Sequence, residues 1–433
     1  DRIAKEGVRF TNSFVANSLS GPSRACLLTG KHSHSNGFTD NTKTFDGGQQ
    51  TFPKLLKQAG YQTAIVGKWH LTSEPTGFDY WNILIGQGDY YNPYFIDNGE
   101  KKQIEGYATN ITTDLAIDWM DQKRDKNKPF CLLLHHKAPH RTWMPDTCDL
   151  DLYEDVVYPV PETFYDKYEG RIAASEQEMN IIKDMDLVYD LKMADKENEI
   201  HTTTGLEENG RNLYNRMTPA QKAAWDKHYD PIIKKFKEQK LTGKALAEWK
   251  YQQYMHDYMR VIHSVDRNVG RVLDYMEKSG LLENTIIVYT SDQGFYMGEH
   301  GWFDKRFMYE ESFRTPLIIR YPAKIKAGSE CTALVQNIDY APTYLDIAGI
   351  EKPDYMVGTS LVPLFGGETP RDWREYLYYH YYDYPAIHMV RRHDGVRDSR
   401  YKLIHFYNDI DVWELYDLQE DPHEMNNLYG KPS

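Results

Sequence analysis

A short segment near the start of the chain combines residue types that suit the binding of an anion. Residues 20–30 read Ser-Gly-Pro-Ser-Arg-Ala-Cys-Leu-Leu-Thr-Gly. A Pro-Ser pair followed by Arg and an apolar turn is typical of a loop that enters a helix N-terminus, where the backbone favours negative charge. We therefore expect Ser20 near positive potential, with Arg24 one helical turn away. Taken alone, this Ser and Arg would equally describe a capped helix without a chemical role.

Two further segments place histidines beside the ends of expected strands. Gly-Lys-Trp-His-Leu at 67–71 contains Lys68 and His70, and Ala-Pro-His-Arg-Thr-Trp at 138–143 contains His140. A histidine in such a position can act as a general acid or base. Each segment alone has an ordinary explanation, either as a polar surface loop or as a hydrogen-bonded loop histidine.

The second half of the chain offers oxygen ligands and another lysine. Asp292 and Gln293 follow an expected strand, and their side-chain oxygens suit calcium or magnesium. In an open α/β sheet, ligands bind at the end of the strands where these residues stand. Lys305 lies in the sequence Phe-Asp-Lys-Arg at 303–306. An Asx-type turn is the structural alternative for the Asp-Gln pair.

Together these segments resemble the sulfatase family, whose signature reads Cys or Ser, any residue, Pro-Ser-Arg, and then Leu-Thr-Gly. The resemblance implies that Ser20 is oxidised after translation to formylglycine by a maturation enzyme, which becomes an expected partner. The hydrated aldehyde has two hydroxyl groups on one carbon, one to attack sulfur and one to expel sulfate. Because a plain Ser lacks the second hydroxyl, an unmodified Ser20 predicts a trapped or nearly inactive enzyme.

The resemblance also assigns roles to the other residues. A cation, Ca²⁺ or alternatively Mg²⁺, would be held by Asp292, Gln293 and the residue at Ser20, and would lower the pKa of the hydrate. Lys68 would contact both sulfate and the hydrate, and His70 would hold a hydrate oxygen or act as a base. His140 would be the general acid, and Lys305 would contact a sulfate oxygen and help to protonate the leaving oxygen. Arg24 is counted with these catalytic residues.

Two longer strings narrow the expected substrate. Residues 136–141 and 301–312 look like bacterial N-acetylglucosamine-6-O-sulfatases that act on host glycans, so a sulfated glycan is the expected partner. A Ser at position 20 is typical of anaerobic bacteria, which favours a periplasmic or secreted enzyme; an engineered Cys-to-Ser replacement is the alternative explanation. Candidates for holding the sugar are Asp304, Arg306, His388, Arg391 and Arg392.

Two other functions stay open at this point. One is a phosphate or phosphonate ester hydrolase of the same superfamily, which would use a plain Ser or Thr nucleophile and more His and Asp metal ligands; the Pro-Ser-Arg string argues against it. The other is a catalytically dead glycan-binding homologue, which an unmodified Ser20 would suit.

Alternating strand and helix patterns predict an α/β fold with a large, mixed, mostly parallel sheet flanked by helices, as in alkaline phosphatase-like proteins. Strands are expected at 61–67, 130–134 and 285–290, and a long helix at about 244–279. We expect a catalytic domain over residues 1–350 and an α+β subdomain with a small antiparallel sheet over 351–433. The polar stretch at about 184–243 is interpreted as an insertion of helices and loops on the surface.

Charge and hydropathy argue against nucleic-acid binding and against a membrane-spanning segment. The net charge of −13 argues against a general nucleic-acid binder, and no apolar run reaches the roughly 18 residues that span a bilayer. Sulfatases normally begin with a strand that ends in two adjacent Asp residues, and nothing before Ser20 supplies this pair. Because the chain also starts without Met, we expect that this first strand and part of the metal shell lie upstream of Asp1.

Overall fold

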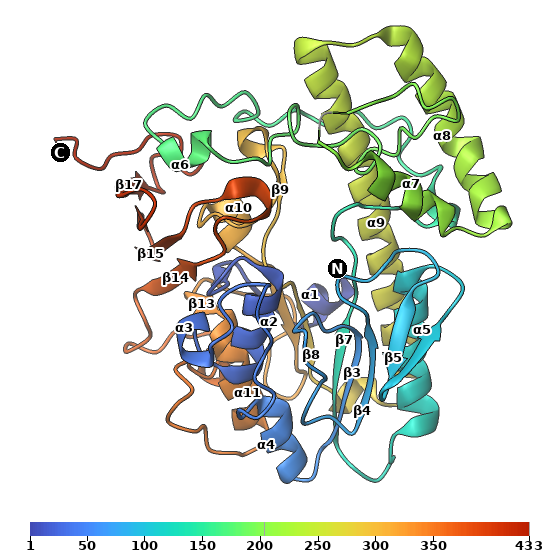
Figure 1. The fold of residues 1–433 in the computed structure, drawn as a ribbon. Helices are drawn as coiled ribbons and strands as arrows, with labels where there is room; N and C mark the ends of the chain where they lie inside the picture. Colours follow the sequence, from blue (N-terminus) through green and yellow to red (C-terminus); the bar gives the residue numbers. More distant parts are fainter. Residues whose placement is uncertain (203, 433) are drawn as a thin grey trace.

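The computed structural model describes residues 1–202 and 204–432, and two sheets form its centre (Figure 1). Among the described residues, no helix has the length and hydropathy needed to cross a bilayer. The four-stranded sheet has the order β12 (Ser329–Cys331), β1 (Val8–Phe10), β11 (Leu317–Arg320), β8 (Ile287–Thr290). The five-stranded sheet has the order β6 (Glu100–Gln103), β5 (Tyr94–Asp97), β4 (Tyr80–Leu84), β3 (Gln62–Lys68), β7 (Phe130–His135).

The expected α/β class with mixed sheets and flanking helices is confirmed, but the strands are divided between two sheets. In the five-stranded sheet, β3 is parallel to both β4 and β7, while β5 and β6 extend the edge as an antiparallel hairpin. In the other sheet, β11 is antiparallel to both β1 and β8. β12 is parallel to β1 at the edge of that sheet. Strand β3, which carries Lys68 at its end, has parallel neighbours on both sides.

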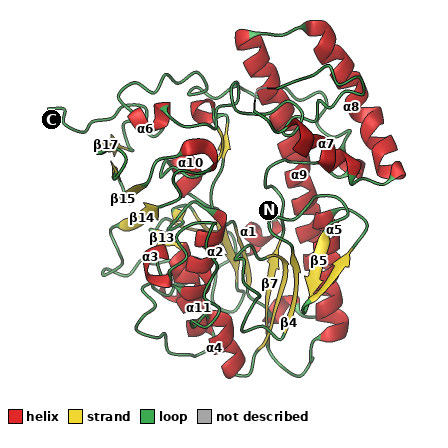
Figure 2. Cartoon of the chain, in the orientation of Figure 1, coloured by secondary structure: helices red, strands yellow, loops and turns green. Residues whose placement is uncertain are grey.

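Helices cover both faces of the five-stranded sheet (Figure 2). Because successive side chains of a strand point to opposite faces, Ile65 of β3 packs into one core cluster, whereas Ala64 and Val66 pack into another. The first cluster receives α2 (Ser20–Thr29), α4 (Phe52–Gln58) and α11 (Tyr340–Ile347). The second receives α5 (Ala108–Asp118) and α9 (Gly243–Lys278).

The long helix predicted at about 244–279 is α9, which spans Gly243–Lys278. Its apolar residues recur at helical spacing, and Tyr254, Val261 and Met276 are buried. The chain then turns through η3 (Leu282–Asn284) into β8, which delivers Asp292 just beyond its last residue.

The segment at 184–243 contains helices and loops, as the sequence indicated, but it is partly buried rather than wholly on the surface. It contains α7 (Glu207–Asn215) and α8 (Pro219–Gln239), and α8 begins with a capping box between Thr218 and Gln221. Trp225 and Tyr229 are buried in the largest hydrophobic cluster together with residues of α9. Trp225, Tyr229 and Ile233 recur every four residues, which places them on one face of α8. The polar residues between them hide this period in the composition of the segment, and only the tertiary structure shows what the face packs against.

The last part of the chain forms a four-stranded antiparallel sheet: β14 (Leu377–Tyr381), β15 (His393–Arg397), β16 (Tyr401–Phe406) and β17 (Val412–Asp417). It packs on α10 (Glu310–Phe313) through buried charges, with Lys402 Nζ 3.0 Å from Glu310 and 2.6 Å from Glu424. The proposed boundary near residue 350 stays a prediction.

Short elements complete the described chain. The helical ones are α1 (Arg2–Glu6), α3 (Ser33–Asn36), η1 (Trp119–Lys123), η2 (Thr147–Asp149), α6 (Ile172–Ser175), η4 (Glu299–Gly301), η5 (Asn337–Asp339), η6 (Val362–Leu364) and η7 (Ile387–Met389). The two-stranded pairs are β2 (Ser13–Phe14) with β13 (Val335–Gln336), and β9 (Tyr296–Met297) with β10 (Phe303–Asp304).

Candidate active site

Ser20 is the first residue of α2, as the sequence predicted, and it is buried. Its hydroxyl donates to Asp292 Oδ2 at 2.7 Å and accepts a hydrogen bond from Lys68 Nζ at 2.9 Å. The helix ends at Gly30, whose left-handed conformation (φ 63°) suits glycine. The Ser20 oxygen is therefore held between a carboxylate and an ammonium at the positive end of a helix.

Arg24 joins α2 to the ends of three strands. Its Nε and Nη2 donate to Asp292 Oδ2, which follows β8, at 3.1 and 3.0 Å. Its Nη1 donates to the carbonyl of Lys68 in β3 at 2.8 Å and lies 3.0 Å from Nδ1 of His135 in β7. The His135 ring therefore contacts the Arg24 guanidinium at the end of β7.

Asp292 and Gln293 form the candidate cation site. Burial alone would raise the pKa of Asp292, but the charges of Arg24 and Lys68 and the hydrogen bond from Ser20 lower it. The carboxylate is therefore ionised. Gln293 Oε1 is buried and has no hydrogen-bond partner among the described residues. An uncompensated buried oxygen beside an ionised carboxylate fits a hard divalent cation.

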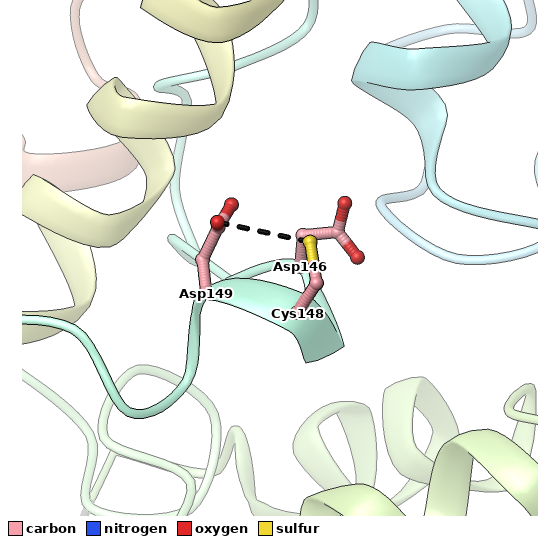
Figure 3. A group of neighbouring side chains, drawn as sticks. All are labelled: Asp146, Cys148 and Asp149. Carbon is pink, nitrogen blue, oxygen red and sulfur yellow. Dashed lines mark hydrogen bonds between the residues drawn. The ribbon is translucent and has the colours of Figure 1, made fainter.

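A second group of possible metal ligands lies outside the candidate cation site (Figure 3). It comprises Asp146, Cys148 and Asp149. Arg267 Nη2 donates to Asp146 at 2.9 Å, and Arg267 Nη1 donates to Asp149 Oδ2 at 2.7 Å. The cluster is thus an arginine-bridged turn, and no cation is needed to explain it.

Cationic side chains surround the Ser20 hydroxyl. Lys68 is buried, and burial followed by the charge of Arg24 lowers the pKa of its ammonium well below the ordinary value; Lys305 and Lys137 act in the same direction. Like charges in a low-dielectric site repel one another. An anion placed among these four groups would relieve this repulsion, so the site is suited to a sulfate or phosphate group.

The two predicted catalytic histidines are both uncharged in the ligand-free site. Burial, and then the charges of Lys68 and Arg24, lower the pKa of His70 to about 2. Its Nδ1 is buried without a partner among the described residues. Burial and the charge of Lys305 likewise lower the pKa of His140 well below 6.5. A bound anion would raise both pKa values, because it offsets the surrounding positive charge.

The Asp304 carboxylate contacts three other residues that the sequence indicated as candidates: Lys305, Arg306 and His388. Lys305 Nζ lies 2.9 Å from Asp304 Oδ1, while Arg306 Nη1 donates to Oδ2 at 2.9 Å and His388 Nε2 lies 2.7 Å from the same oxygen. All four residues are buried. Asp304 and Arg306 have φ angles of 73° and 117°, which residues other than glycine rarely adopt. A strained, charged turn of this kind is typical of functional sites.

Arg391 and Arg392 are not part of this cluster. Arg391 donates to Glu176 at 2.9 Å, and Arg392 donates to Asp409 at 2.8 Å. Both guanidinium groups also lie over the ring of Tyr384. Contact of either arginine with a sugar stays a prediction.

Sequence reasoning missed Lys137, although it stands in the string that contains His140. It is buried, and its ammonium lies 4.8 Å from the centre of the Tyr90 ring and 3.3 Å from the carbonyl of Gln87. Burial lowers its pKa to about 8. The signal that could have revealed it is its position three residues before a histidine at a strand end, where a lysine is close enough to share the same ligand.

The fold and this arrangement define a hydrolase that acts on a tetrahedral oxyanion ester at a hydroxyl held on a helix N-terminus. Comparison with known families makes this more specific: the Sulfatase model matches residues 1–350, and the model for the C-terminal part of N-sulphoglucosamine sulphohydrolase matches residues 298–433. The chain belongs to the sulfatase family.

Individual relatives agree with this assignment. The chain is 56% identical to an N-acetylglucosamine-6-O-sulfatase of Bacteroides thetaiotaomicron, over 100% of this chain and 78% of the relative. It is 26% identical to the N-acetylglucosamine-6-sulfatase of Capra hircus, over 98% of this chain and 75% of that protein. A solved structure of a protein with its substrate D-glucosamine-2-N,6-O-disulfate superimposes with a TM-score of 0.96 and 56% identity, over 100% of this chain and 88% of that one.

Proposed function

We propose that this protein hydrolyses sulfate esters on glycans, and that its substrate is the 6-O-sulfate of N-acetylglucosamine or a closely related glucosamine. The observation that carries the proposal is the Ser20 hydroxyl, held by Asp292 and Lys68 at the start of α2 among cationic side chains. The identity of the relatives supports the sugar.

The nucleophile in this proposal is formylglycine made from Ser20 by a maturation enzyme. When present, the hydrated aldehyde supplies two hydroxyl groups on one carbon, one for attack on sulfur and one for release of sulfate. Asp292 and Gln293 would hold calcium, or magnesium, which supplies positive charge beside the sulfate oxygens. The buried Gln293 oxygen without a partner among the described residues supports this placement.

The surrounding residues bind the sulfate group and move protons. Lys68 donates to the Ser20 hydroxyl, and Arg24 donates to Asp292, which accepts from the same hydroxyl; both side chains would neutralise sulfate oxygens. His70 is uncharged, so it can accept a proton near position 20. His140 Nδ1 lies 2.8 Å from the carbonyl of Arg141, which leaves Nε2 for the leaving oxygen. Once sulfate binding raises its pKa, His140 would protonate that oxygen, assisted by Lys305.

Sugar binding is assigned to the cluster around Asp304. Its carboxylate, with Arg306 and His388, offers acceptors and donors in fixed positions next to Lys305. Sugar hydroxyls are both donors and acceptors, so such a cluster can bind them specifically. Arg391 and Arg392 would contact only longer glycans, since both are paired at the rim with Glu176 and Asp409.

A periplasmic or secreted location is part of the same proposal, because host glycans are found outside the cytoplasm. The partners implied are the sulfated glycan and the maturation enzyme. The resemblance of the 20–30 segment to Ser-type sulfatases supports maturation by oxidation of a serine.

One experiment tests the whole proposal. The protein is co-produced with a formylglycine-generating enzyme, and the peptide around Ser20 is examined by mass spectrometry for the loss of two hydrogens. Release of sulfate from 6-O-sulfated N-acetylglucosamine is then compared with release of phosphate from the 6-phosphate of the same sugar. A carbonyl at position 20 with sulfate release supports the proposal. Preferential phosphate release, or sulfate release from protein with an intact serine, would contradict it.

A further inference from the structure

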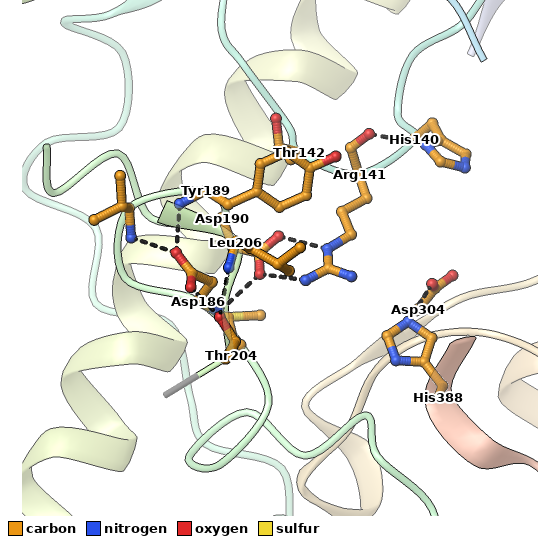
Figure 4. Close-up of polar contacts among 12 residues, drawn as sticks. His140, Arg141, Thr142, Asp186, Tyr189, Asp190, Thr204, Leu206, Asp304 and His388 are labelled. Carbon is orange, nitrogen blue, oxygen red and sulfur yellow. Dashed lines mark hydrogen bonds and ion pairs between the residues drawn. The ribbon is translucent and has the colours of Figure 1, made fainter. Parts of the chain in front are cut away.

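Arg141 follows His140 directly, and the catalytic scheme leaves it without a role. Its Nε and Nη2 donate to the two carboxylate oxygens of Asp190 at 2.6 and 2.7 Å. This is the bidentate geometry in which an arginine is held in one orientation. Figure 4 shows the guanidinium between Asp190 on one side and the Asp304–His388 pair on the other.

The third guanidinium nitrogen, Nη1, has no acceptor among the described residues, and 12% of the Arg141 side chain is exposed. The guanidinium lies 5.2 Å from the centre of the Phe303 ring, and that ring is 5.3 Å from the ring of His388. Arg141 is therefore adjacent to the cluster assigned to the sugar and to the histidine assigned to the leaving oxygen. An oriented donor at this point is available to a ligand.

The orientation of Arg141 is set by the segment at 184–243. Asp190 is completely buried, and its Oδ2 also accepts from the backbone N–H of Asp186 at 2.8 Å. Lys192 Nζ donates to the carbonyl of Thr142 at 2.6 Å and lies 3.0 Å from Asp257 of α9. The segment thus clamps the loop that carries His140 and Arg141 from one side.

We propose that Arg141 is a specificity-determining residue that donates a hydrogen bond from Nη1 to an oxygen substituent of the sugar, and that Asp190 is its positioning residue. This inference depends on the proposed function. The acceptor is either a ring hydroxyl or a second sulfate, since both present oxygens to an arginine N–H. A site built to bond such an oxygen discriminates against substrates that lack it.

The test uses the matured holoenzyme and three substrates: 6-O-sulfated N-acetylglucosamine, D-glucosamine-2-N,6-O-disulfate and 4-nitrophenyl sulfate. Arg141→Gln is combined with Asp190→Asn, so that no buried carboxylate loses its partner. Arg141→Lys is made as a single variant, and its kinetics decide the test if the double variant does not fold. We expect kcat/KM to fall about tenfold or more for at least one sugar sulfate, and to change less than about twofold for the aryl sulfate.

The matched control is Arg267→Gln combined with Asp149→Asn, which removes another Arg–Asp ion pair, in which Arg267 Nη1 donates to both carboxylate oxygens of Asp149. It should leave all three substrates unaffected. A loss on both sugars assigns a ring hydroxyl as the acceptor, and a loss confined to the disulfate assigns the second sulfate. Equal losses on sugar and aryl sulfates, or unchanged sugar kinetics, would overturn the proposal.

The positioning role of Asp190 has its own readout. Asp190→Asn leaves the Arg141 charge in place but loosens its orientation, so KM for the sugar sulfate should rise while kcat for the aryl sulfate stays the same. Asp190→Glu should restore part of the lost affinity. If the wild-type enzyme releases no sulfate from any substrate, the proposed function fails. If the wild-type enzyme is active and the Arg141 and Asp190 variants have the same kinetics, only the Arg141 inference fails.

Discussion

The Ser20 hydroxyl lies between one hydrogen-bond acceptor and one hydrogen-bond donor. It donates to the ionised Asp292 and accepts from Lys68. This pair of hydrogen bonds holds the oxygen at position 20 in one place. Sulfate release is therefore expected to depend on the chemical group at the side chain of position 20.

Ser20→Ala should abolish sulfate release, with a loss of at least about 10³-fold in kcat, because it removes the attacking oxygen. Ser20→Cys is the matched variant, since a formylglycine-generating enzyme of the serine-oxidising type also accepts cysteine. It should regain activity in proportion to the carbonyl content found by mass spectrometry. Activity of the alanine variant would show that another group attacks sulfur.

His140→Ala should impair poor leaving groups more than good ones. A sugar alkoxide needs a proton as it departs, so kcat should fall about 10²-fold or more with the sugar sulfate. A nitrophenolate leaves unaided, and its loss should be about tenfold or less. His423→Ala, at an exposed position, is the control. Equal losses on both substrates would refute the general-acid role.

Lys137 should produce a falling limb in the pH profile. Its pKa is about 8 because the ammonium is buried, so its charge disappears as pH rises through that value. The attraction for an anionic substrate weakens with it, and kcat/KM should decline above pH 8. Lys137→Arg keeps the charge and should move the decline to higher pH. An unchanged profile in that variant would exclude Lys137 as its source.

At the scale of elements, α10 connects the site to the C-terminal sheet. It begins at Glu310, four positions after Arg306, and Glu310 is bound by Arg397 and Lys402 of that sheet. The neighbouring Glu311 has no comparable partner: its Oε2 is buried without a hydrogen bond among the described residues. Burial, and then the charge of Glu424, raise the pKa of Glu311 to about 8.

This raised pKa predicts a loss of stability in alkali. The folded state holds the Glu311 proton up to about pH 8, whereas the unfolded chain loses it near its ordinary value of 4.5. Stability from this group is thus complete below pH 4.5 and declines as pH rises to 8. Glu311→Gln should raise the free energy of unfolding at pH 9 by on the order of a few kcal/mol, and the melting temperature should rise with it. At pH 4 the substitution should raise neither quantity.

Glu368→Gln, at an exposed position, is the control for the pH series and should change the melting temperature at neither pH. A Glu311→Gln protein with the same alkaline destabilisation as wild type would show that another group is responsible.

At the scale of the whole molecule, the candidate site joins distant parts of the chain. Ser20 and Asp292 are hydrogen-bonded although 272 positions separate them, and α2 and β8 belong to different structural layers. A cation held by Asp292 and Gln293 would bind only the folded state, in which these parts meet. Mass action then requires it to stabilise the fold.

Exhaustive chelation should therefore lower both activity and melting temperature, and calcium should restore both. At a free concentration about 100 times its dissociation constant, a bound ion stabilises by about 2.7 kcal/mol. Gln293→Leu, which removes one ligand at similar volume, should reduce the response of melting temperature to calcium. Full activity after complete chelation would remove the metal from the scheme.

The sequence alone determined the parts of this protein that are encoded locally. Helix α9 follows from an apolar period, because a period reports which face of a helix is buried. Strands β3, β7 and β8 follow from short apolar runs, which indicate buried strands. The segments around Ser20 and His140 are short strings, so their resemblance to sulfatases needs no knowledge of the fold. Family and reaction class were available from these strings.

Only the tertiary structure decided which residues share a site. Burial of Lys137, the Arg141–Asp190 pair and the packing of Trp225 all depend on contacts between positions far apart in the chain. The same holds for Arg391 and Arg392, whose partners Glu176 and Asp409 remove them from the Asp304 cluster. The pKa of a side chain and the orientation of a guanidinium are set by desolvation and neighbouring charge, which no local pattern in the sequence records.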